Sequence, residues 1–342
     1  MSARVIIIAE AGVNHNGDIN LAKKLIDIAA ESGADYVKFQ TYKTEKLVTQ
    51  LAKKADYQIQ QNTDEDDLQF SMLKKLELTK TAHLELIHHA KDKGIAFLST
   101  AFDEESIDFL DELGIPFFKI PSGEITNLPF LQHVASKGKP IVLSTGMCML
   151  EEVKEAIELL RKNGVKKEDL IVLHCTTDYP TPFIDVNLGA MNLIQLECDV
   201  QVGYSDHTLG IELAIAAVAR GAVLIEKHFT LDKSLLGPDH QASLEPDELF
   251  KMVQGIRNIE SALSGNNKKE PTISELENQK VARKSIHVRT NLSKNHSLVK
   301  DDLIMLRPGD GISPMKINQI IGKKLVHDLE TGHKLNFNDL SE

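Results

Sequence analysis

Four short apolar runs between residues 140 and 230 decide the fold: PIVLSTG (140–146), LIVLHCTT (170–177), VQVGYSDH (200–207) and VLIEKHFT (223–230). Amphipathic stretches with helical spacing separate these runs, at about 150–163, 187–196 and 210–220. Short strands that are apolar on both faces and alternate with helices are typical of a parallel sheet covered by helices. This stretch therefore predicts a series of strand–helix units.

The same alternation extends from this stretch towards both ends of the chain. Further strands are predicted at 5–11, 35–42, 95–102 and 117–124, and further helices at 18–32, 80–93, 104–113, 128–137 and 246–263. In the first helix Asp18 can cap the start and Gly33 can follow the end. Eight strands and eight helices predict a (β/α)₈ TIM barrel over residues 1–263. The alternative is a doubly wound open sheet, but the turn after the first strand reads AGVNHNG and lacks the GxGxxG pattern of that fold.

Two segments depart from the alternation. Residues 43–79 form a long insertion after the second strand, and loops of this length usually cover or line a binding site. Its acidic run at 64–67 is interpreted as the solvated start of a helix rather than a metal site. A polar linker (264–283) leads to a tail (284–342) of short strands and turns, which carries a net charge of +2 from nine basic and seven acidic residues. We expect this tail to be a small domain that docks against another surface, because so short a chain buries only a modest core.

The composition excludes several classes of function. The 342 residues include 39 Lys and Arg against 50 Asp and Glu, a net charge of −11, and an acidic chain without a block of cations is not expected to bind nucleic acid. The first apolar run ends at Glu10 and no segment holds twenty uninterrupted apolar residues, so neither a signal peptide nor a membrane span is expected. Cys148, Cys175 and Cys198 stand singly, which is typical of buried free thiols in a reducing compartment and predicts a cytoplasmic protein.

Polar side chains stand at the C-terminal ends of all eight predicted strands, where barrel enzymes place their catalytic residues. Lys38 and Lys119 alternate with apolar neighbours and should point inward, where an ammonium group needs an anion. Ser122, Ser144 and Ser205 lie close to glycines and add hydroxyl and backbone N–H donors. Together these residues predict a cradle for a phosphate or carboxylate. The alternative is that the two lysines form structural salt bridges to glutamates of the barrel.

His207 and His228 end neighbouring strands, which lie about 4.8 Å apart in a sheet, so the two imidazoles could share one divalent ion. Two histidines leave coordination positions open for water or substrate, as a catalytic ion requires. Asp206 and Glu226 could fix the tautomers of the rings. The spacing alone also leaves open that both histidines are packed structurally.

Carboxylates complete the predicted mouth of the barrel. Glu10 and Glu124 are expected to point inward at the ends of the first and fourth strands, where they suit acid–base catalysis or hydroxyl recognition. The segment GPDH (237–240) can place Asp239 over the same mouth. The residues therefore predict a metal-assisted barrel enzyme that acts on an anionic, phosphorylated, polyhydroxy substrate, without identifying the reaction.

A family resemblance rests on eight motifs that occur in order along the chain. AEAGVNHNGD, VKFQT, KIPSGE, LSTGM, HCTTDYPTP, GYSDHT, IEKHFT and GPDHQASLEPDEL resemble the motifs of the sialic acid (nonulosonate) synthase family. The tail resembles the antifreeze-like (SAF) domain of that family. The resemblance implies a C–C bond-forming transferase that condenses phosphoenolpyruvate with an N-acylated mannose-type sugar to a nine-carbon 2-keto acid and phosphate.

The resemblance also implies roles for individual residues. His207 and His228 correspond to ligands of a divalent ion, usually Mn²⁺ and replaceable by Mg²⁺ or Co²⁺, and Glu10 corresponds to the acid–base glutamate. The implied phosphoenolpyruvate contacts are Lys38, Lys119, Ser122, Ser144, Thr177 and Ser205. The implied sugar contacts are Gln40, Thr100, Glu124, Tyr179 and Asp239. Arg307 corresponds to an arginine that reaches the N-acyl group of the sugar in the partner subunit, which implies a domain-swapped homodimer.

Three residues depart from the pattern common in this family: Thr177 stands where Asn is frequent, Ala101 where Pro is usual, and Asp310 where Asn is usual. EAGVNHNGD, SGEITNLP and HCTTDYP most resemble the bacterial branch that makes N,N′-diacetyllegionaminate. The acceptor implied by that branch is 2,4-diacetamido-2,4,6-trideoxymannose.

Three alternatives to this reading stay open at the level of sequence. The nearest is an N-acetylneuraminate synthase that acts on N-acetylmannosamine. A metal-dependent aldolase that uses free pyruvate is more distant, because pyruvate has no phosphate for the predicted cradle to hold. A binding or structural protein that works through its tail is the third.

Overall fold

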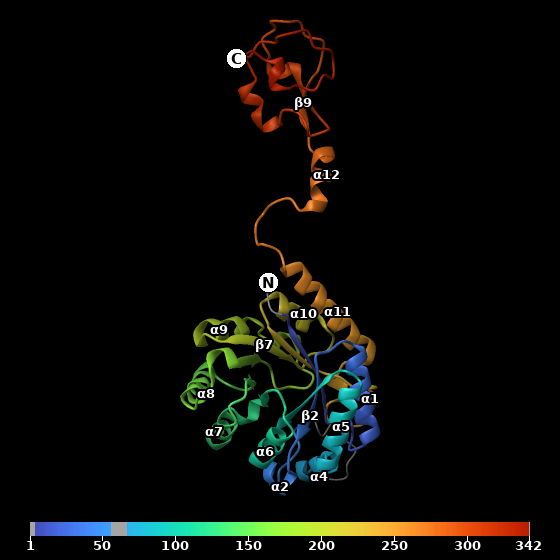
Figure 1. The fold of residues 1–342 in the computed structure, drawn as a ribbon, viewed down its shortest axis with the longest axis vertical. Coiled ribbons are helices and arrows are strands. Elements are labelled where there is room, and N and C mark those ends of the chain that lie inside the picture. Colours follow the sequence, from blue (N-terminus) through green and yellow to red (C-terminus); the bar gives the residue numbers. More distant parts are fainter. Residues whose placement is uncertain (1–3, 56–66, 342) are drawn as a thin grey trace. The chain divides into compact units, whose positions relative to one another are not determined.

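The computed structural model describes residues 4–55 and 67–341 and divides into two compact units, Met1–Gly265 and Asn266–Glu342. Each unit is described by itself (Figure 1). The acidic run predicted as a helix start lies outside the described residues except for Asp67, which is exposed. No helix in the described ranges is long and apolar enough to cross a membrane.

Eight parallel strands form the first unit in the hydrogen-bonded order β3-β2-β1-β8-β7-β6-β5-β4. The end strands β3 and β4 also contact each other, so the sheet curves into a barrel and the predicted fold class is confirmed. The strands are β1 (Ile6–Gly12), β2 (Tyr36–Thr41), β3 (Ala96–Ala101), β4 (Phe118–Ile120), β5 (Ile141–Ser144), β6 (Leu170–His174), β7 (Gln201–Asp206) and β8 (Leu224–His228).

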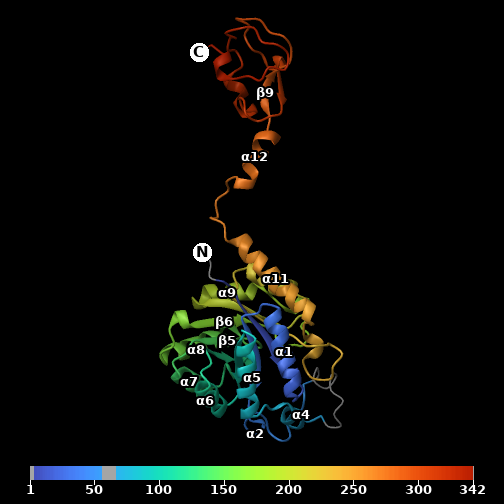
Figure 2. The same ribbon diagram turned by 45° about the vertical axis from the view of Figure 1, so that its right-hand side comes forward.

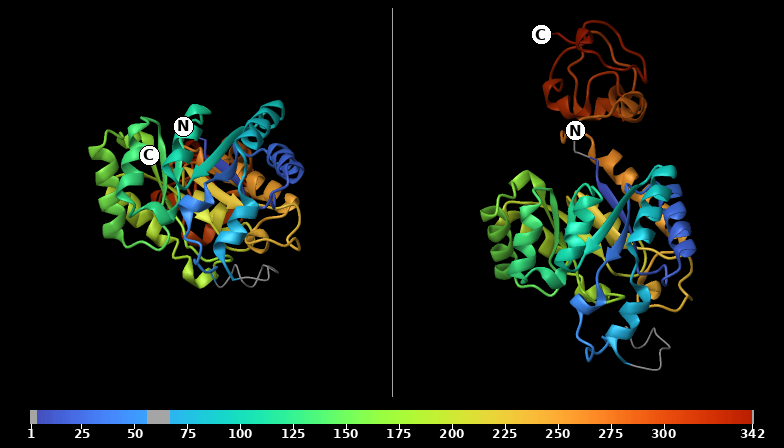
Figure 3. Two further views of the ribbon diagram at one scale, coloured as in Figure 1. Left: turned by 90° about the horizontal axis from the view of Figure 1, so that it is seen from below. Right: turned by 60° about the horizontal axis from the view of Figure 1, so that its bottom comes forward.

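Helices surround the strands, as Figures 1 and 3 show. They are α1 (Ile19–Glu31), α5 (Lys80–Asp92), α6 (Glu104–Glu112), α7 (Leu128–Ser136), α8 (Leu150–Lys162), α9 (Gly189–Cys198), α10 (Glu212–Ala219) and α11 (Pro246–Leu263). The predicted cap of the first helix is present, because the Asp18 side chain accepts a hydrogen bond from the backbone N–H of Asn20 at 2.7 Å. Apolar side chains between the barrel and the helices form one continuous core.

The insertion after β2 forms two short helices, α2 (Thr44–Leu47) and α4 (Gln69–Leu76). Both lie beyond the barrel at the end opposite the N-terminus (Figure 2). Because the chain enters α2 directly from the C-terminal end of β2, the insertion stands at the mouth where the strands end.

The fourth strand is shorter than the sequence predicts. It ends at Ile120, and Ser122–Glu124 form a 3₁₀ turn instead of continuing the strand. Pro121 explains the break, because proline has no N–H to donate to a neighbouring strand. Glu124 therefore does not stand at the end of this strand, as the sequence predicted, but on the turn that follows it.

The second unit has a small core of its own. β9 (Ser285–Val288) and β10 (Leu303–Leu306) form an antiparallel pair, and the core consists of Ile286, Val288, Leu298, Leu303, Ile312, Ile320, Leu325, Leu329, Leu335 and Leu340. The stretch predicted as a linker contains helix α12 (Ile273–Ala282), which has no buried residue. All three cysteines of the chain are free; Cys175 and Cys198 are buried, whereas Cys148 is half-buried.

Gly203 in β7 provides a test of how tightly the barrel is packed. A Cβ atom there would lie 2.4 Å from the backbone oxygen of Leu224 and 2.6 Å from the side chain of Leu173. We expect Gly203→Ala to lower the free energy of unfolding by about 1–3 kcal/mol, because overpacking forces neighbouring atoms to shift. Urea denaturation followed by circular dichroism measures the change. Gly265→Ala is the control, since a Cβ atom at Gly265 meets no atom within 4 Å; equal midpoints for the two variants would contradict the expectation.

Candidate active site

A cavity of about 400 Å³ opens at the C-terminal ends of the barrel strands. Parallel strands bring their C-terminal ends to one mouth, which is why residues far apart in the sequence meet there. Thirteen of the predicted site residues line this cavity: Glu10, Lys38, Gln40, Thr100, Lys119, Ser122, Ser144, Thr177, Tyr179, Ser205, His207, His228 and Asp239. The structure thus brings these residues together, whereas the chemical role of each one stays a prediction.

Four buried charged side chains form the floor of the cavity, and we call Glu10, Lys38, Lys119 and Glu226 the charged quartet. The Lys38 ammonium lies 2.7 Å from Glu10 Oε2 and 3.6 Å from Glu226 Oε2. Lys119 Nζ lies 3.3 Å from Glu226 Oε1. The two lysines therefore line the cavity and also pair with barrel glutamates, so both interpretations of the sequence describe part of the arrangement.

The two glutamates of the quartet differ in their protonation. Burial raises the pKa of Glu10 to about 7, although Lys38 acts in the opposite direction. Burial also opposes the charge of Glu226, but the nearby ammonium groups of Lys119 and Lys38 outweigh it and hold its pKa at about 2. Glu226 is therefore a fixed negative charge, whereas Glu10 can take up and release a proton near neutral pH, as general acid–base chemistry requires.

Hydroxyl groups gather on the side of the cavity formed by β4, β5 and β6. The Ser144 and Thr177 hydroxyls are buried and have no hydrogen-bond partner among the described residues. Ser122 Oγ accepts a hydrogen bond from the Gly146 N–H at 2.9 Å. A Cβ atom at Gly146 would lie 2.1 Å from Thr177 Oγ1, so glycine is needed for these groups to approach one another. Buried donors without partners beside a lysine suit an anionic ligand.

The two histidines face each other at the ends of β7 and β8, with ring centroids 5.6 Å apart. Nδ1 of His207 donates to the Thr176 carbonyl at 2.6 Å, which leaves Nε2 as the lone-pair nitrogen. Burial lowers the pKa of His207 to about 4 and that of His228 well below its usual value, so both rings are neutral at pH 7. The ring of Tyr179 lies 4.1 Å from that of His207.

These rings fit a divalent ion in their chemistry. A histidine binds a metal ion in its neutral form, which both rings have at pH 7. The buried Nδ1 of His228 also has no hydrogen-bond partner among the described residues. Asp239, whose pKa is raised to about 6 by burial, has its carboxylate 3.8 Å from that nitrogen. Within residues 4–55 and 67–341 no group of three His, Cys, Asp or Glu side chains is arranged to hold a metal. An ion on the two imidazoles would therefore need water or substrate oxygens to complete its coordination.

The predicted partners of the imidazoles need correction. Asp206 does not orient a histidine ring; its carboxylate pairs with Lys227 at 2.8 Å, and both side chains are fully buried. Lys227 also donates to the Thr208 carbonyl at 2.5 Å. Glu226 accepts hydrogen bonds from Ser205 and Lys119 rather than from a ring nitrogen. The group that fixes the His207 tautomer is the Thr176 carbonyl, a backbone atom that no side-chain pattern indicates.

One predicted site residue of the first unit, Glu124, is not among the residues that line the cavity. Glu124 sits on the turn after β4 and accepts a hydrogen bond from the Asn127 amide at 2.6 Å. Arg307 is exposed in the second unit and its reach into an active site stays a prediction. Asp310, one of the departures from the family pattern, pairs with Lys334 at 2.7 Å.

The sequence reasoning did not name the apolar part of the lining. Val13, Phe102 and several residues of the insertion face the cavity: Leu47, Val48, Met72, Leu73 and Leu76. The spacing of Met72, Leu73 and Leu76 within QFSMLKKL was the available signal, because it places these side chains on one face of a helix.

Comparisons with known proteins agree with this geometry. A model of the NeuB family matches residues 25–269, and a model of the SAF domain matches residues 283–341. The chain is 53% identical to an N,N′-diacetyllegionaminic acid synthase of Campylobacter jejuni, over 94% of this chain and 95% of that protein. It is 35% identical to the human N-acetylneuraminate-9-phosphate synthase, over 95% of this chain and 89% of that protein. A crystal structure of N-acetylneuraminic acid synthetase from Leptospira borgpetersenii in complex with citrate is 36% identical, with a TM-score of 0.70, and covers 81% of this chain and 90% of that one.

The buried pair of Lys227 and Asp206 gives a test of the strand ends that carry the histidines. We expect Lys227→Met to lower the free energy of unfolding by about 3–5 kcal/mol, because the Asp206 carboxylate would stay buried without its partner. The double variant Asp206→Leu/Lys227→Met should recover most of that loss, since no unpaired charge remains. Urea denaturation of the variants measures both changes, and a double variant no more stable than Lys227→Met would contradict this account.

Proposed function

The chain belongs to the NeuB family and ends in a SAF domain, and from this premise we propose that it is an N,N′-diacetyllegionaminate synthase. In this reaction phosphoenolpyruvate condenses with 2,4-diacetamido-2,4,6-trideoxymannose and water to give a nine-carbon 2-keto acid and phosphate. The observation that carries the proposal is the 53% identity, over nearly the full length of both chains, to a synthase of that name. The cavity also has a cationic, hydroxyl-rich side next to a pair of imidazoles.

Phosphoenolpyruvate fits the side of the cavity above β4, β5 and β6. Its phosphate and carboxylate need cations and hydrogen-bond donors, and Lys119, Ser122, Ser144 and Thr177 supply both there. The hydroxyls of Ser144 and Thr177 would gain partners that they lack within the described chain. The ammonium groups of Lys38 and Lys119 would then be shared between the anionic groups of the donor and the carboxylates of Glu10 and Glu226.

The acceptor aldehyde belongs beside His207 and His228, which would hold the divalent ion, Mn²⁺ by family resemblance. When bound there, such an ion supplies Lewis-acid polarisation of a carbonyl oxygen. Gln40, Thr100, Tyr179 and Asp239 line the same region and offer groups that can hydrogen-bond a sugar. Their convergence orients the open-chain sugar with its C1 towards the donor.

The residues of the floor account for the movement of protons. C3 of phosphoenolpyruvate attacks the aldehyde carbon, and water adds to the cationic C2. Glu10 takes the proton of that water and returns one to the new hydroxyl oxygen, as its pKa of about 7 permits. The tetrahedral C2 then loses phosphate by cleavage of its C–O bond, and the proton of its hydroxyl passes to the departing phosphate, which leaves the 2-keto acid. Glu226 keeps its negative charge throughout and stabilises the positive charge that develops at C2.

A homodimer in which the SAF domain of the partner covers the barrel mouth forms part of the proposal. Large apolar side chains in the loops after β5 to β8 are exposed, among them Met147, Phe183 (63% exposed), Ile184 (90%), Leu209 and Leu236. An apolar rim of this kind is typical of a surface that another protein covers. Arg307 of the partner subunit would reach the sugar from there. Because its three cysteines are free, as is typical of a reducing compartment, we also propose the cytoplasm as its location.

The imidazole pair is tested by removing each ring. We expect His207→Ala and His228→Ala to lower kcat by at least about 100-fold and to weaken Mn²⁺ binding measured by isothermal titration calorimetry. Excess chelator should abolish phosphate release from phosphoenolpyruvate and acceptor, and added Mn²⁺ should restore it. His88→Ala, at an exposed helix position, is the control and should change neither quantity. Full turnover in excess chelator would contradict the proposal.

The bond that breaks is tested with phosphoenolpyruvate carrying ¹⁸O in its C–O–P bridge. Cleavage of the C–O bond leaves the label in the released phosphate, which mass spectrometry detects. Label in the keto acid and unlabelled phosphate would instead show P–O cleavage and overturn the mechanism. Omission of the sugar should prevent phosphate release, which separates this reaction from simple hydrolysis of the donor.

A further inference from the structure

The cavity has two unlike sides. The side above β4, β5 and β6 carries the hydroxyls and Lys119. On the other side β1, β2 and β3 contribute the polar residues Glu10, Lys38, Gln40 and Thr100, whereas the segments that follow these strands contribute mainly aliphatic and aromatic side chains. We call this second group the apolar wall; it consists of Val13, Leu47, Val48, Met72, Leu73, Leu76 and Phe102. With the donor on the polar side and the aldehyde at the histidines, this wall is the remaining large surface of the cavity for the far end of the acceptor.

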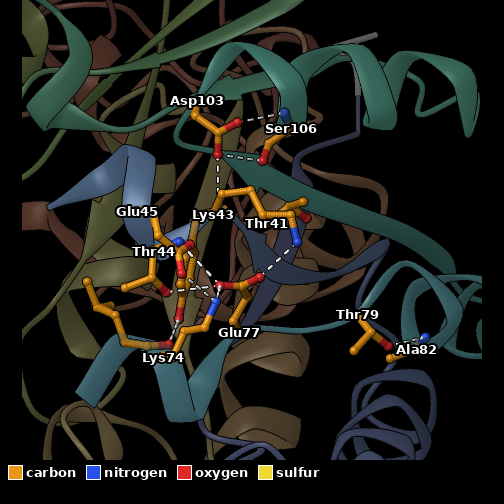
Figure 4. A network of polar contacts seen from close by, with 12 residues as sticks. Thr41, Lys43, Thr44, Glu45, Lys74, Glu77, Thr79, Ala82, Asp103 and Ser106 are labelled. Atoms are coloured by element: carbon orange, nitrogen blue, oxygen red, sulfur yellow. Dashed lines mark hydrogen bonds and ion pairs between the residues drawn. The ribbon is translucent and has the colours of Figure 1, made fainter. Parts of the chain in front are cut away.

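A half-buried carboxylate joins the helices that carry most of the wall. Glu77 accepts hydrogen bonds from Lys43 Nζ at 2.8 Å, Thr44 Oγ1 at 3.0 Å and Lys74 Nζ at 3.1 Å (Figure 4). Although its partial burial opposes the charge, these donors hold the pKa of Glu77 at about 2. The start of α2 and the end of α4 are thereby joined to one anion, and Asp103 after β3 accepts a further bond from the Lys43 N–H at 2.9 Å. The wall is therefore a fixed surface of the barrel mouth.

The wall offers no cation to a ligand. Among the described lining residues the Lys and Arg side chains are Lys38 and Lys119, both of which lie in the charged quartet. Lys43 and Lys74 stand behind the wall and are bound to Glu77, and Lys74 also pairs with Glu45 at 2.9 Å. A phosphate group buried against these apolar side chains would lose its hydration without gaining a partner, which is costly.

We propose that the apolar wall selects the acceptor by the end remote from its aldehyde. An uncharged apolar end, such as the methyl group of a 6-deoxy sugar, is accepted, and a phosphorylated end is rejected. The inference rests on the proposed function and deepens it, because it assigns the choice of acceptor to seven residues. The human relative bears the name of a 9-phosphate synthase, so phosphorylated sugars are a realistic competing class of acceptor.

The test compares three acceptors in the full-length protein: 2,4-diacetamido-2,4,6-trideoxymannose, N-acetylmannosamine and N-acetylmannosamine 6-phosphate. Phosphate release is corrected for any phosphatase activity, and kcat/KM is measured for each sugar. We expect the 6-deoxy sugar to exceed the 6-phosphate by at least about 100-fold, with N-acetylmannosamine between them.

Two variants place a cation in the wall. Val48→Lys changes a half-buried position and Met72→Lys a buried one. If the Met72→Lys variant does not fold, the Val48→Lys variant still allows the measurement. Each should raise kcat/KM for the 6-phosphate relative to the 6-deoxy sugar by at least about 10-fold, because an ammonium group would pair with the phosphate. Leu51→Lys is the matched control: it adds the same charge to the same insertion at a side chain that is 83% exposed and outside the lining. Its acceptor ratio should match the wild type, and KM for phosphoenolpyruvate should change little in all three variants.

The outcomes separate this inference from the function on which it rests. No turnover of any acceptor by the wild-type protein would overturn the proposed function itself. Turnover with equal kcat/KM for the 6-deoxy and 6-phosphate sugars would overturn the inference and leave the synthase activity standing. An unchanged acceptor ratio in a folded Val48→Lys variant would likewise overturn it, as would an equal shift in Leu51→Lys.

Discussion

The site depends on one electrostatic constraint, which is that two ammonium groups and two carboxylates are buried together at the end of a barrel. Each of these charges alone would cost several kcal/mol in desolvation, so none is stable there without the others. Lys38 bridges Glu10 and Glu226, while Lys119 contacts Glu226 alone. The unequal sharing explains why the two carboxylates behave differently: burial opposes the charge of both, but two cations hold Glu226 ionised, whereas Glu10 pairs with Lys38 alone and its pKa is raised to about 7. When Glu10 is protonated, the two ammonium groups face one carboxylate, and the floor carries a net positive charge that suits an anionic ligand.

Along β7 and β8 the side chains alternate between those that face the cavity and those that pack on the other side of the strands. Ser205 and His207 face the cavity from β7, and Glu226 and His228 face it from β8. The residues between them, Asp206 and Lys227, form a fully buried ion pair away from the cavity. A shift of one residue in the pairing of these strands would turn the imidazoles away from the cavity and bring Asp206 and Lys227 to face it. The outward ion pair and the inward site therefore stabilise the same strand register, which explains why a buried salt bridge stands directly beside the histidines.

Much of this arrangement follows from the sequence because parallel strands bring their C-terminal ends to one mouth. That rule alone places Glu10, Lys38, His207 and His228 together, although more than two hundred residues separate the first from the last. Where the sequence prediction differs from the structure, local backbone geometry is responsible: β4 ends before Pro121, and Glu124 stands on the turn that follows, outside the cavity lining. The orientation of His207 could not be predicted, because its partner is the Thr176 carbonyl. The insertion was predicted to cover or line a binding site. Its apolar contribution to the lining depends on how α2 and α4 pack against each other, which the spacing of apolar residues within the eight residues of α4 does not determine.

The division of the cavity into a charged floor and an apolar wall has a consequence for how acceptor preference can vary within one fold. The floor residues come from strand ends, where a substitution disturbs buried ion pairs and the barrel register together. The wall residues come mainly from an insertion whose two helices are joined through Glu77 and which is bound to the end of β3 through Asp103, so their side chains can change without altering a strand. A family that keeps one donor and changes its sugar would therefore be expected to vary in the insertion and to preserve the strand ends. The physical reason is that, in the proposed function, the donor contacts strand ends alone, whereas the far end of the sugar contacts a segment inserted between them.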